Sequence, residues 1–171
     1  MKNKTLVVFV LAMAILSLPM CSVIATKPVS ITASRTRDTS SGDPPESRMA
    51  GKSDNRFTIV TGTIFEWTGD IEGNSTQDAI RFYHNVDLSL PPPKRLPVRV
   101  HAVCTFESAT VMGKSGGLTM KLQFVIDEEA NFKGNWVIIG GTDDLANLHG
   151  QGKVSGPKGA EVFSGMLHFD S

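Results

Sequence analysis

Apolar residues recur at every second position in several segments of the chain. The clearest runs are Val98–Phe106 and Leu118–Ile126, where apolar residues alternate with mostly polar ones. Shorter runs of the same period lie within Phe57–Trp67, Asp78–Val86, Phe132–Ile138 and Phe163–Phe169. A period of two is typical of a β-strand with one apolar and one polar face. The pattern therefore predicts an antiparallel sheet of seven or eight strands with one face packed on a core.

Two of the shorter runs give a specific expectation about which side chains face the core. In each run a set of large apolar residues shares one parity along the chain. Residues of one parity lie on the same face of a strand. We therefore expect two sets to face inward: Phe57, Ile59, Phe65 and Trp67 in the first run, and Ile80, Phe82 and Val86 in the second.

Turn signals separate these runs. Gly113–Gly117 has the length and composition of a hairpin connection. Pro91–Pro93 cannot lie in a central strand, so Leu90–Pro97 is expected to be an extended loop. Asp143–Leu148 could form one helical turn capped by Thr142. Since no segment predicts a long helix, the strands are expected to form a barrel or a sandwich.

The first 25 residues have the layout of a secretory signal peptide. Two lysines in Met1–Lys4 precede the uncharged apolar stretch Thr5–Leu18, Pro19 interrupts it, and Val23–Ala25 suits cleavage after Ala25. The apolar stretch is shorter than the roughly 20 residues of a typical membrane span. We expect the protein to be secreted or to lie at the cell surface or in the periplasm, without a membrane span after cleavage. An uncleaved anchor is the alternative.

Cys21 allows a second form of anchoring. A lipoprotein leader ends in a short apolar and small-residue motif before an acylated cysteine, but Leu18–Cys21 has Met20 in the position of the small residue. Lipidation is therefore the less favoured alternative. After cleavage at Ala25 only Cys104 remains, and one cysteine cannot form an internal disulfide.

The next segment, residues 26–55, is predicted to be a disordered linker. It is rich in serine and threonine, contains Gly42–Pro45, and has no aromatic residue. Such a composition offers little apolar surface to offset the entropy cost of ordering. The expected organisation is a signal peptide over 1–25, a linker over 26–55 and a β-barrel domain over 56–171.

Composition and charge narrow the range of partners. The chain has 17 basic and 17 acidic residues, and removal of Lys2 and Lys4 with the leader leaves a small negative charge. No basic surface for nucleic acid is expected from this balance.

Several segments, taken in order, resemble a known family. They are Trp67–Thr76, Cys104–Glu107, Gly113–Gly116, Gly134–Gly152 and Phe163–Asp170. Together they resemble small microbial domains of unknown function in the allene oxide cyclase-like β-barrel superfamily. The resemblance implies one closed barrel of about eight antiparallel strands around an apolar cavity. It implies no function, because a fold alone confers none, and no substrate-handling residue of the plant cyclase can be placed on this sequence.

The candidate catalytic and metal-binding residues form no recognisable motif. His84, His101, His149 and His168 lack the spacing that brings ligands together on one element, so neither a metal nor another cofactor is expected. Glu66, Asp70, Glu72 and Glu107 could meet at one barrel end and divide acid and base roles, or could simply be solvated. Cys104 has the apolar parity of its strand, which favours a core residue over a reactive thiolate.

The aromatic residues of the core parity are the best candidates for binding. An eight-stranded barrel is either filled by its side chains or holds one small ligand. We expect the candidate ligand-lining residues to fill the interior or to line a pocket: Phe65, Trp67, Phe82, Cys104, Phe106, Phe124 and Trp136.

These observations favour an exported, non-enzymatic barrel that binds a small apolar ligand or a partner protein. One alternative is an isomerase or cyclase acting on a hydrophobic, oxidised-lipid-like substrate through Glu66 or Glu107. Another is a structural protein of the surface or envelope.

Overall fold

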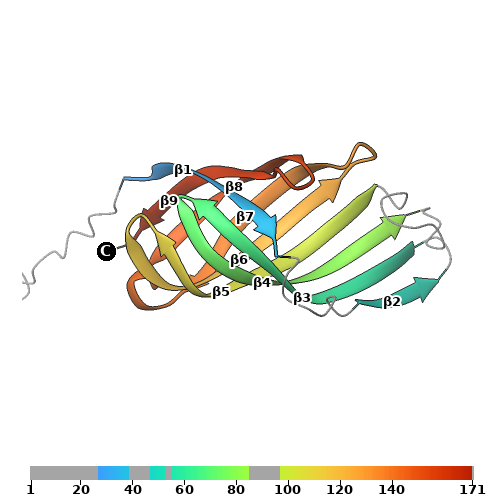
Figure 1. Cartoon of the computed structure of the whole chain (residues 1–171), viewed down its shortest axis with the longest axis horizontal. Coiled ribbons are helices and arrows are strands. Elements are labelled where there is room, and N and C mark those ends of the chain that lie inside the picture. The colour runs from blue at the N-terminus through green and yellow to red at the C-terminus, as the bar shows by residue number, and fades with distance from the viewer. Residues whose placement is uncertain (1–26, 39–46, 53–54, 85–96, 171) are drawn as a thin grey trace, which may run out of the picture.

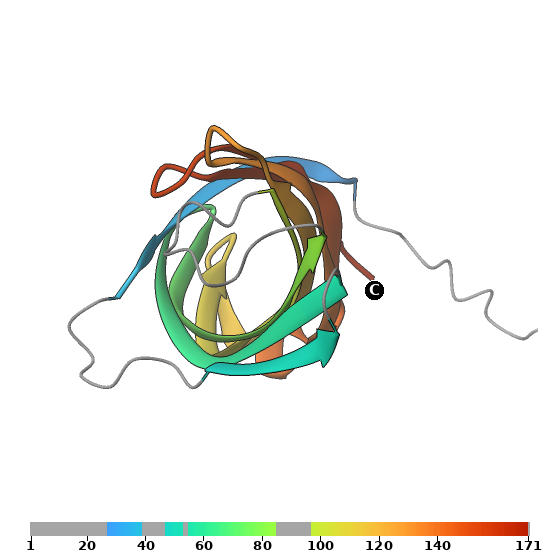
Figure 2. The same cartoon turned by 90° about the vertical axis from the view of Figure 1, so that its right-hand side faces the viewer.

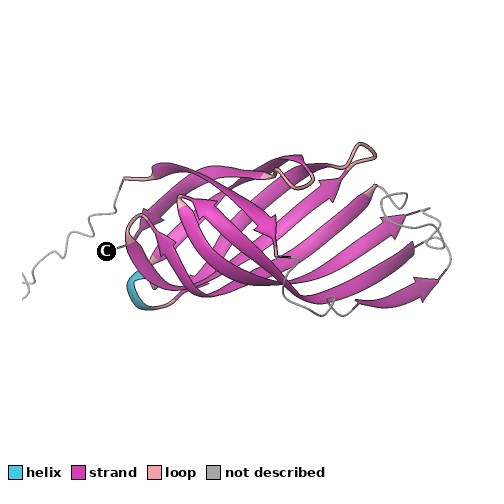
Figure 3. Cartoon of the chain, in the orientation of Figure 1, coloured by secondary structure: helices cyan, strands magenta, loops and turns pink. Residues whose placement is uncertain are grey.

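The computed structural model describes residues 27–38, 47–52, 55–84 and 97–170, and nearly all of them lie in β-strands. These ranges contain nine strands and one short 3₁₀-helix (Figures 1 and 3). The strands and the helix have these bounds: β1 Val29–Arg37, β2 Ser47–Lys52, β3 Asn55–Gly69, β4 Ile71–His84, β5 Val98–Val111, β6 Lys114–Ile126, β7 Asn131–Gly141, η1 Asp143–Leu145, β8 Leu148–Pro157 and β9 Val162–Phe169.

Eight of these strands form a closed antiparallel barrel. Strands β3 to β9 follow one another as a meander, and β1 closes the ring by pairing with both β9 and β3. Ala33 at the middle of β1 lies opposite Phe163 on one side and Gly69 on the other. Strand β2 lies outside this ring and pairs with the first half of β3. The view along the barrel shows the closed ring (Figure 2), and the prediction of an all-β closed barrel is confirmed.

The closing strand β1 comes from the segment that the sequence predicted to be a linker. Its side chains alternate, with Ile31, Ala33 and Arg35 buried and the intervening residues exposed. The prediction of disorder was wrong here because β1 needs little apolar surface of its own: both of its edges are hydrogen-bonded to neighbouring strands. Strand β2 also falls in the predicted linker. The leader, Cys21 and Leu90–Leu96 of the predicted loop lie outside the described residues.

The long alternating runs face the core as expected. In β5 and β6 the residues of the apolar parity are buried or nearly so, from Val98 to Phe106 and from Leu118 to Ile126. The same holds in β7 and β9, where Phe132, Trp136 and Phe163 are buried. Directly opposite pairs, such as Cys104 and Met120, share the inner face.

The expected faces are wrong in the first half of β3. A β-bulge lies between Val60 and Thr63, with Gly62 at a φ of +72° and its N–H donating to Asp78 Oδ1 at 3.0 Å. One extra residue reverses the parity of everything beyond it. Phe65 and Trp67 therefore face inward, whereas Ile59, of the same sequence parity, is exposed on the outer face.

Strand β4 also reverses the expected faces. Ile80 and Phe82 are exposed on the outside, while Ala79 and Tyr83 are buried. The strand carries apolar residues of both parities, so its neighbour decides between them: Ala79 lies opposite Ala102, whose inward position in β5 is unambiguous. Phe82 is thus not an interior residue. Val86 lies outside the described residues.

Two connections differ in detail from the predicted turns. The β5–β6 hairpin turns at Met112 and Gly113, both with positive φ (53° and 76°), which is typical of a type I′ turn. The predicted helical turn is present as η1. Thr142 begins it, but the Thr142 hydroxyl does not cap its backbone; it accepts the Gly117 N–H at 2.9 Å and thereby ties η1 to β6.

Candidate functional site

Most of the predicted ligand-lining residues come together in the middle of the barrel and pack tightly. The Trp67 ring centroid lies 5.4 Å from that of Phe106 and 4.6 Å from that of Phe163. Trp67 also donates its Nε1–H to Ser75 Oγ at 2.9 Å, which satisfies the polar atom of the indole. Phe124 packs in the same way on Phe132, with centroids 5.0 Å apart.

Trp136 fills the barrel where two neighbouring strands have no side chain. Its indole lies over Gly152 and Gly165, where an added Cβ would come within 2.7 and 2.6 Å of ring carbons. The Nε1–H donates to the Ser164 carbonyl at 3.3 Å. Glycines are therefore needed at both positions to admit the ring.

The packing favours a filled interior over a lined pocket. Five of the seven candidate residues expose at most 5% of their surface: Trp67, Cys104, Phe106, Phe124 and Trp136. Side chains that line a water-filled cavity would expose a larger fraction of their surface. Phe65 is partly buried on the inner face, and Phe82 lies on the outer face with 41% exposed.

A buried arginine is the main interior feature that the sequence did not reveal. Arg35 on β1 exposes 3% of its surface, and its guanidinium carbon lies 4.1 Å from the Phe65 ring centroid and 5.1 Å from that of Phe163. Its Nη1 donates to Gln77 Oε1 at 2.6 Å, whereas its Nε has no hydrogen-bond partner among the described residues. The alternation around Arg35 could have indicated its position, but a charged residue in a serine- and threonine-rich segment favoured the linker interpretation.

Burial lowers the pKa of Arg35, and nearby groups oppose that effect. Desolvation disfavours the charged guanidinium, while the neighbouring Cys104 and Glu161 side chains raise the pKa again. Glu161 is itself buried and directly precedes Val162, which pairs with Ser34 in the β1–β9 register. The nearby Phe65 and Phe163 rings stabilise the cation further.

The Cys104 thiol is a core group, as the sequence predicted. Burial raises its pKa to about 11, and the positive charge of Arg35 offsets only part of that rise. The thiol donates to Gln77 Oε1 at 3.4 Å. A protonated, fully buried thiol is a poor nucleophile.

The four carboxylates considered for acid–base chemistry are solvated. Glu66, Asp70, Glu72 and Glu107 are all exposed. Asp70 has a structural contact, since its Oδ2 accepts the Thr32 N–H at 2.6 Å and so holds the start of β1. Among the described residues no group of three or more histidine, cysteine or acidic side chains could hold a metal ion.

A groove on the outer face lies where β4 ends and β5 begins. Its volume is about 750 Å³, within the usual range for small-molecule sites. Its apolar lining comes from Phe57, Phe82, Tyr83, Pro97, Val98 and Val125, and its polar lining from His84, Arg99 and His101. No acidic side chain belongs to the described lining.

The cross-strand register builds this groove. Phe57, Phe82, Arg99 and Val125 lie in one row across β3 to β6. Phe82 is at its centre, 6.4 Å from the Phe57 ring and 5.3 Å, edge to face, from the His101 ring. We refer to this surface as the Phe82 groove.

A second concave surface crosses the outer face of β6 to β9. Its volume is about 700 Å³, and its lining combines amides, hydroxyls and lysines with the apolar residues Trp136, Val137 and Met166. It offers no cluster of aromatic rings comparable to the Phe82 groove. None of the helices in the described residues has the length and hydropathy to span a membrane.

These features define a small closed antiparallel barrel with a packed core and open grooves on its outer face. Among solved structures it is similar to a protein of unknown function from the DUF3224 family of Shewanella oneidensis MR-1, with a TM-score of 0.60 and 13% sequence identity over 86% of this chain and 98% of that one. At this identity the likeness shows the fold alone. No protein-family profile and no curated protein matches the sequence, so the relationship to allene oxide cyclase-like barrels stays a prediction.

Proposed function

We propose that this chain is an exported, non-enzymatic binding protein that holds a small apolar molecule with a negatively charged group in the Phe82 groove. The observation that carries the proposal is the groove itself: about 750 Å³, lined by aromatic and aliphatic side chains around a single arginine. The export part rests on the leader-like sequence of residues 1–25.

Exposure of apolar side chains supports a binding role for this face. Phe82, Ile80 and Ile59 are each more than a third exposed and lie side by side on β3 and β4, and Val125 of β6 lies across Arg99 in the same row. Contiguous apolar surface such as that of β3 and β4 is costly in water and commonly marks an interaction site. A ligand that covers the Phe82 ring would bury the 41% of its surface that is still exposed, a gain of roughly 1 kcal/mol.

The charges around the groove indicate the ligand class. Arg99 contributes a permanent positive charge. With no acidic group in the described lining, the local field favours an anion. An arginine also matches a carboxylate with two parallel hydrogen bonds.

The enzyme alternative lacks its required geometry. A buried carboxylate among aromatic side chains, with a pKa raised into a useful range, would favour it, but Glu66 and Glu107 are both exposed. The interior thiol is protonated. The observations therefore support binding better than catalysis.

The test is calorimetric titration of the purified chain with dodecanoate and with dodecanol. We expect Phe82→Ala to weaken binding of both by about fivefold, and Arg99→Gln to weaken dodecanoate alone. Ile139→Ala is the matched control, because Ile139 is 50% exposed on β7 and outside the groove. Equal losses in Phe82→Ala and Ile139→Ala, or no binding of dodecanoate, would refute the proposal.

A further inference from the structure

Positive charge gathers on one side of the barrel. Strands β6 to β9 are neighbours in the sheet, and together they contain four lysines but no aspartate or glutamate. Because the chain as a whole has 17 basic and 17 acidic residues, its charges are unevenly distributed around the ring. The four lysines are Lys114, Lys121, Lys133 and Lys153.

Two of these lysines line the second concave surface, which we call the amide groove. Lys121 on β6 lies opposite Val137, and Val137 lies opposite Gln151 on β8. Lys153 is the next outward residue of β8 after Gln151. Since strands lie about 4.8 Å apart and outward residues about 7 Å apart along a strand, the Cα atoms of the two lysines are separated by about 12 Å.

The polar side chains of the amide groove have no partner within the described part of the chain. No described residue forms an ion pair with Lys121 or Lys153. The side-chain amides of Gln123, Asn135 and Gln151 likewise make no hydrogen bond to another described residue. Each amide can donate and accept, as a sugar hydroxyl also can. The groove therefore offers free donors and acceptors beside two cations.

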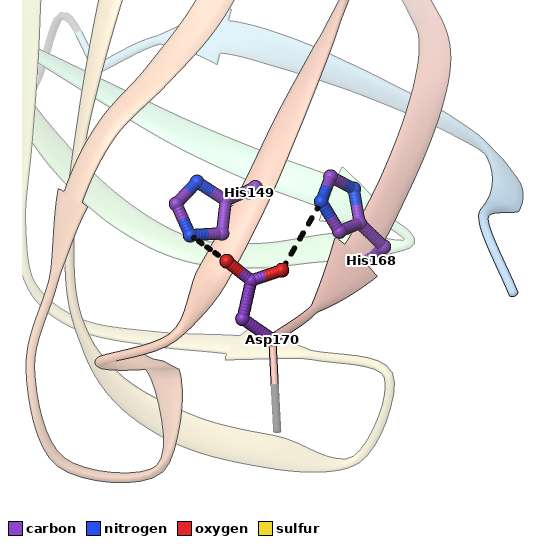
Figure 4. Close-up of polar contacts among 3 residues, drawn as sticks. All are labelled: His149, His168 and Asp170. Carbon is purple, nitrogen blue, oxygen red and sulfur yellow. Dashed lines mark ion pairs between the residues drawn. The ribbon is translucent and has the colours of Figure 1, made fainter. Parts of the chain in front are cut away.

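The two histidines of β8 and β9 already have an acidic partner elsewhere. His149 Nε2 lies 3.1 Å from Asp170 Oδ2, and His168 Nε2 lies 3.5 Å from Asp170 Oδ1 (Figure 4). None of these three residues lines the amide groove. The groove has no acidic side chain in its described lining, so its positive field is uncompensated and favours an anion.

We propose that the amide groove binds an acidic oligosaccharide, whose carboxylates contact Lys121 and Lys153 and whose hydroxyls bond to the side-chain amides. Two cations about 12 Å apart match a ligand with repeated acidic units better than a single phosphate or carboxylate. A nucleic acid fits less well, because single strands bind through bases stacked on aromatic rings, and the aromatic residue of this lining, Trp136, is only 2% exposed. The concave shape fits a chain of sugars better than a flat bilayer.

This site goes beyond the Phe82 groove and does not depend on it. The two surfaces share no lining residue. Lys121→Gln should leave dodecanoate binding unchanged, and Phe82→Ala should leave oligosaccharide binding unchanged. Failure of one site is therefore distinguishable from failure of the other.

The test is calorimetric titration of the purified chain with trigalacturonate and with maltotriose, a neutral trisaccharide. The salt concentration is about 0.1 M, at which charges more than about 10 Å away are largely screened. We expect trigalacturonate to bind more tightly than maltotriose. Lys121→Gln and Lys153→Gln should each weaken trigalacturonate binding by roughly two- to fivefold, the range expected of exposed ion pairs. Asn135→Ala should also weaken it, because a hydrogen bond is lost.

Lys158→Gln is the matched control, since it removes the same charge from an exposed lysine in the β8–β9 turn, outside the groove. Its affinity for trigalacturonate should equal that of the unmodified chain. The proposal is overturned if trigalacturonate does not bind, if maltotriose binds as tightly, or if Lys158→Gln loses as much affinity as the groove variants. Tighter binding of an oligothymidylate of equal charge would assign the groove to nucleic acid instead. Far-ultraviolet circular dichroism checks that each variant keeps the barrel intact.

Discussion

At the scale of single residues, the guanidinium of Arg35 is the most unusual group in the core. An unpaired buried charge is strongly destabilising unless hydrogen bonds and nearby charges compensate. Here Gln77 accepts one hydrogen bond at 2.6 Å and the Phe65 face lies 4.1 Å away. A hydrogen bond to a charged group contributes about 1.5–3 kcal/mol. The three side chains therefore act as one unit that links β1 to β3 and β4.

A double-mutant cycle on Arg35 and Gln77 tests that unit. Gln77→Leu should lower the free energy of unfolding by about 2 kcal/mol, because it leaves the cation without its acceptor. Combining it with Arg35→Met, which removes the charge but keeps an unbranched side chain, should recover part of this loss. Urea denaturation measures both. A neutral Gln77→Leu variant would show that the hydrogen bond does not stabilise the fold.

Cys104 gives a pH-dependent prediction. Since its folded pKa of about 11 exceeds the ordinary thiol pKa of 9.0, the folded state holds the proton more tightly than the unfolded state. The resulting stabilisation is complete below pH 9 and disappears as the pH rises through 11. We expect the unmodified chain to lose about 2–3 kcal/mol over this window relative to Cys104→Ala. Parallel pH dependences in the two proteins would contradict the buried, protonated thiol.

At the scale of elements, β1 decides whether the sheet closes. Without it, β3 and β9 would each present an unpaired edge. Its own contribution to the core is small, comprising Ile31, Ala33 and Arg35, so its stability depends on pairing with both neighbours.

Adjacent substitutions distinguish this strand from a linker. Ile31→Asp would bury a carboxylate in the core and should destabilise the barrel by more than about 4 kcal/mol. Ser30→Asp, one residue earlier on the exposed face, should change stability by less than about 0.5 kcal/mol. Thermal denaturation compares the two. If both variants melt like the unmodified chain, residues 29–37 are not part of the fold.

The bulge in β3 is tested by a pair of glycines. Gly62 and Gly140 both have open space around the position of a Cβ, but only Gly62 has a positive φ. Gly62→Ala should therefore cost about 1 kcal/mol through backbone strain alone. Gly140→Ala should be neutral or slightly stabilising. Chemical denaturation gives both values, and equal effects would argue against the left-handed conformation at Gly62.

At the scale of the whole molecule, the sequence predicted the fold class better than the faces of individual strands. Alternation located β5, β6 and β9 because most of the apolar residues in each strand share one parity. It failed at Ile59, where the bulge at Gly62 reverses the parity, and at Phe82, where β4 carries apolar residues on both faces. Register with neighbouring strands settles such cases, and register is not encoded within one segment.

The candidate binding site lies on the outer face and not in the interior, where the sequence predicted it, for the same reason. Five of the seven candidate ligand-lining residues lie in the core, yet their mutual packing fills the barrel. The Phe82 groove arises because Phe57, Phe82, Arg99 and Val125 from four strands meet in one row. Arg35 was missed because its strand has the composition of a linker. A packed interior leaves the outer face as the place where this barrel can bind a ligand.

The most direct test of this account is a two-dimensional ¹H–¹⁵N NMR titration with dodecanoate. The amides of Arg99 and His101 report on the groove, whereas the indole N–H groups of Trp67 and Trp136 report on the interior. We predict shifts that saturate at the two amides and leave both indole signals unchanged. Shifts of the indole signals with unchanged amides would place the ligand inside the barrel and contradict the proposed site.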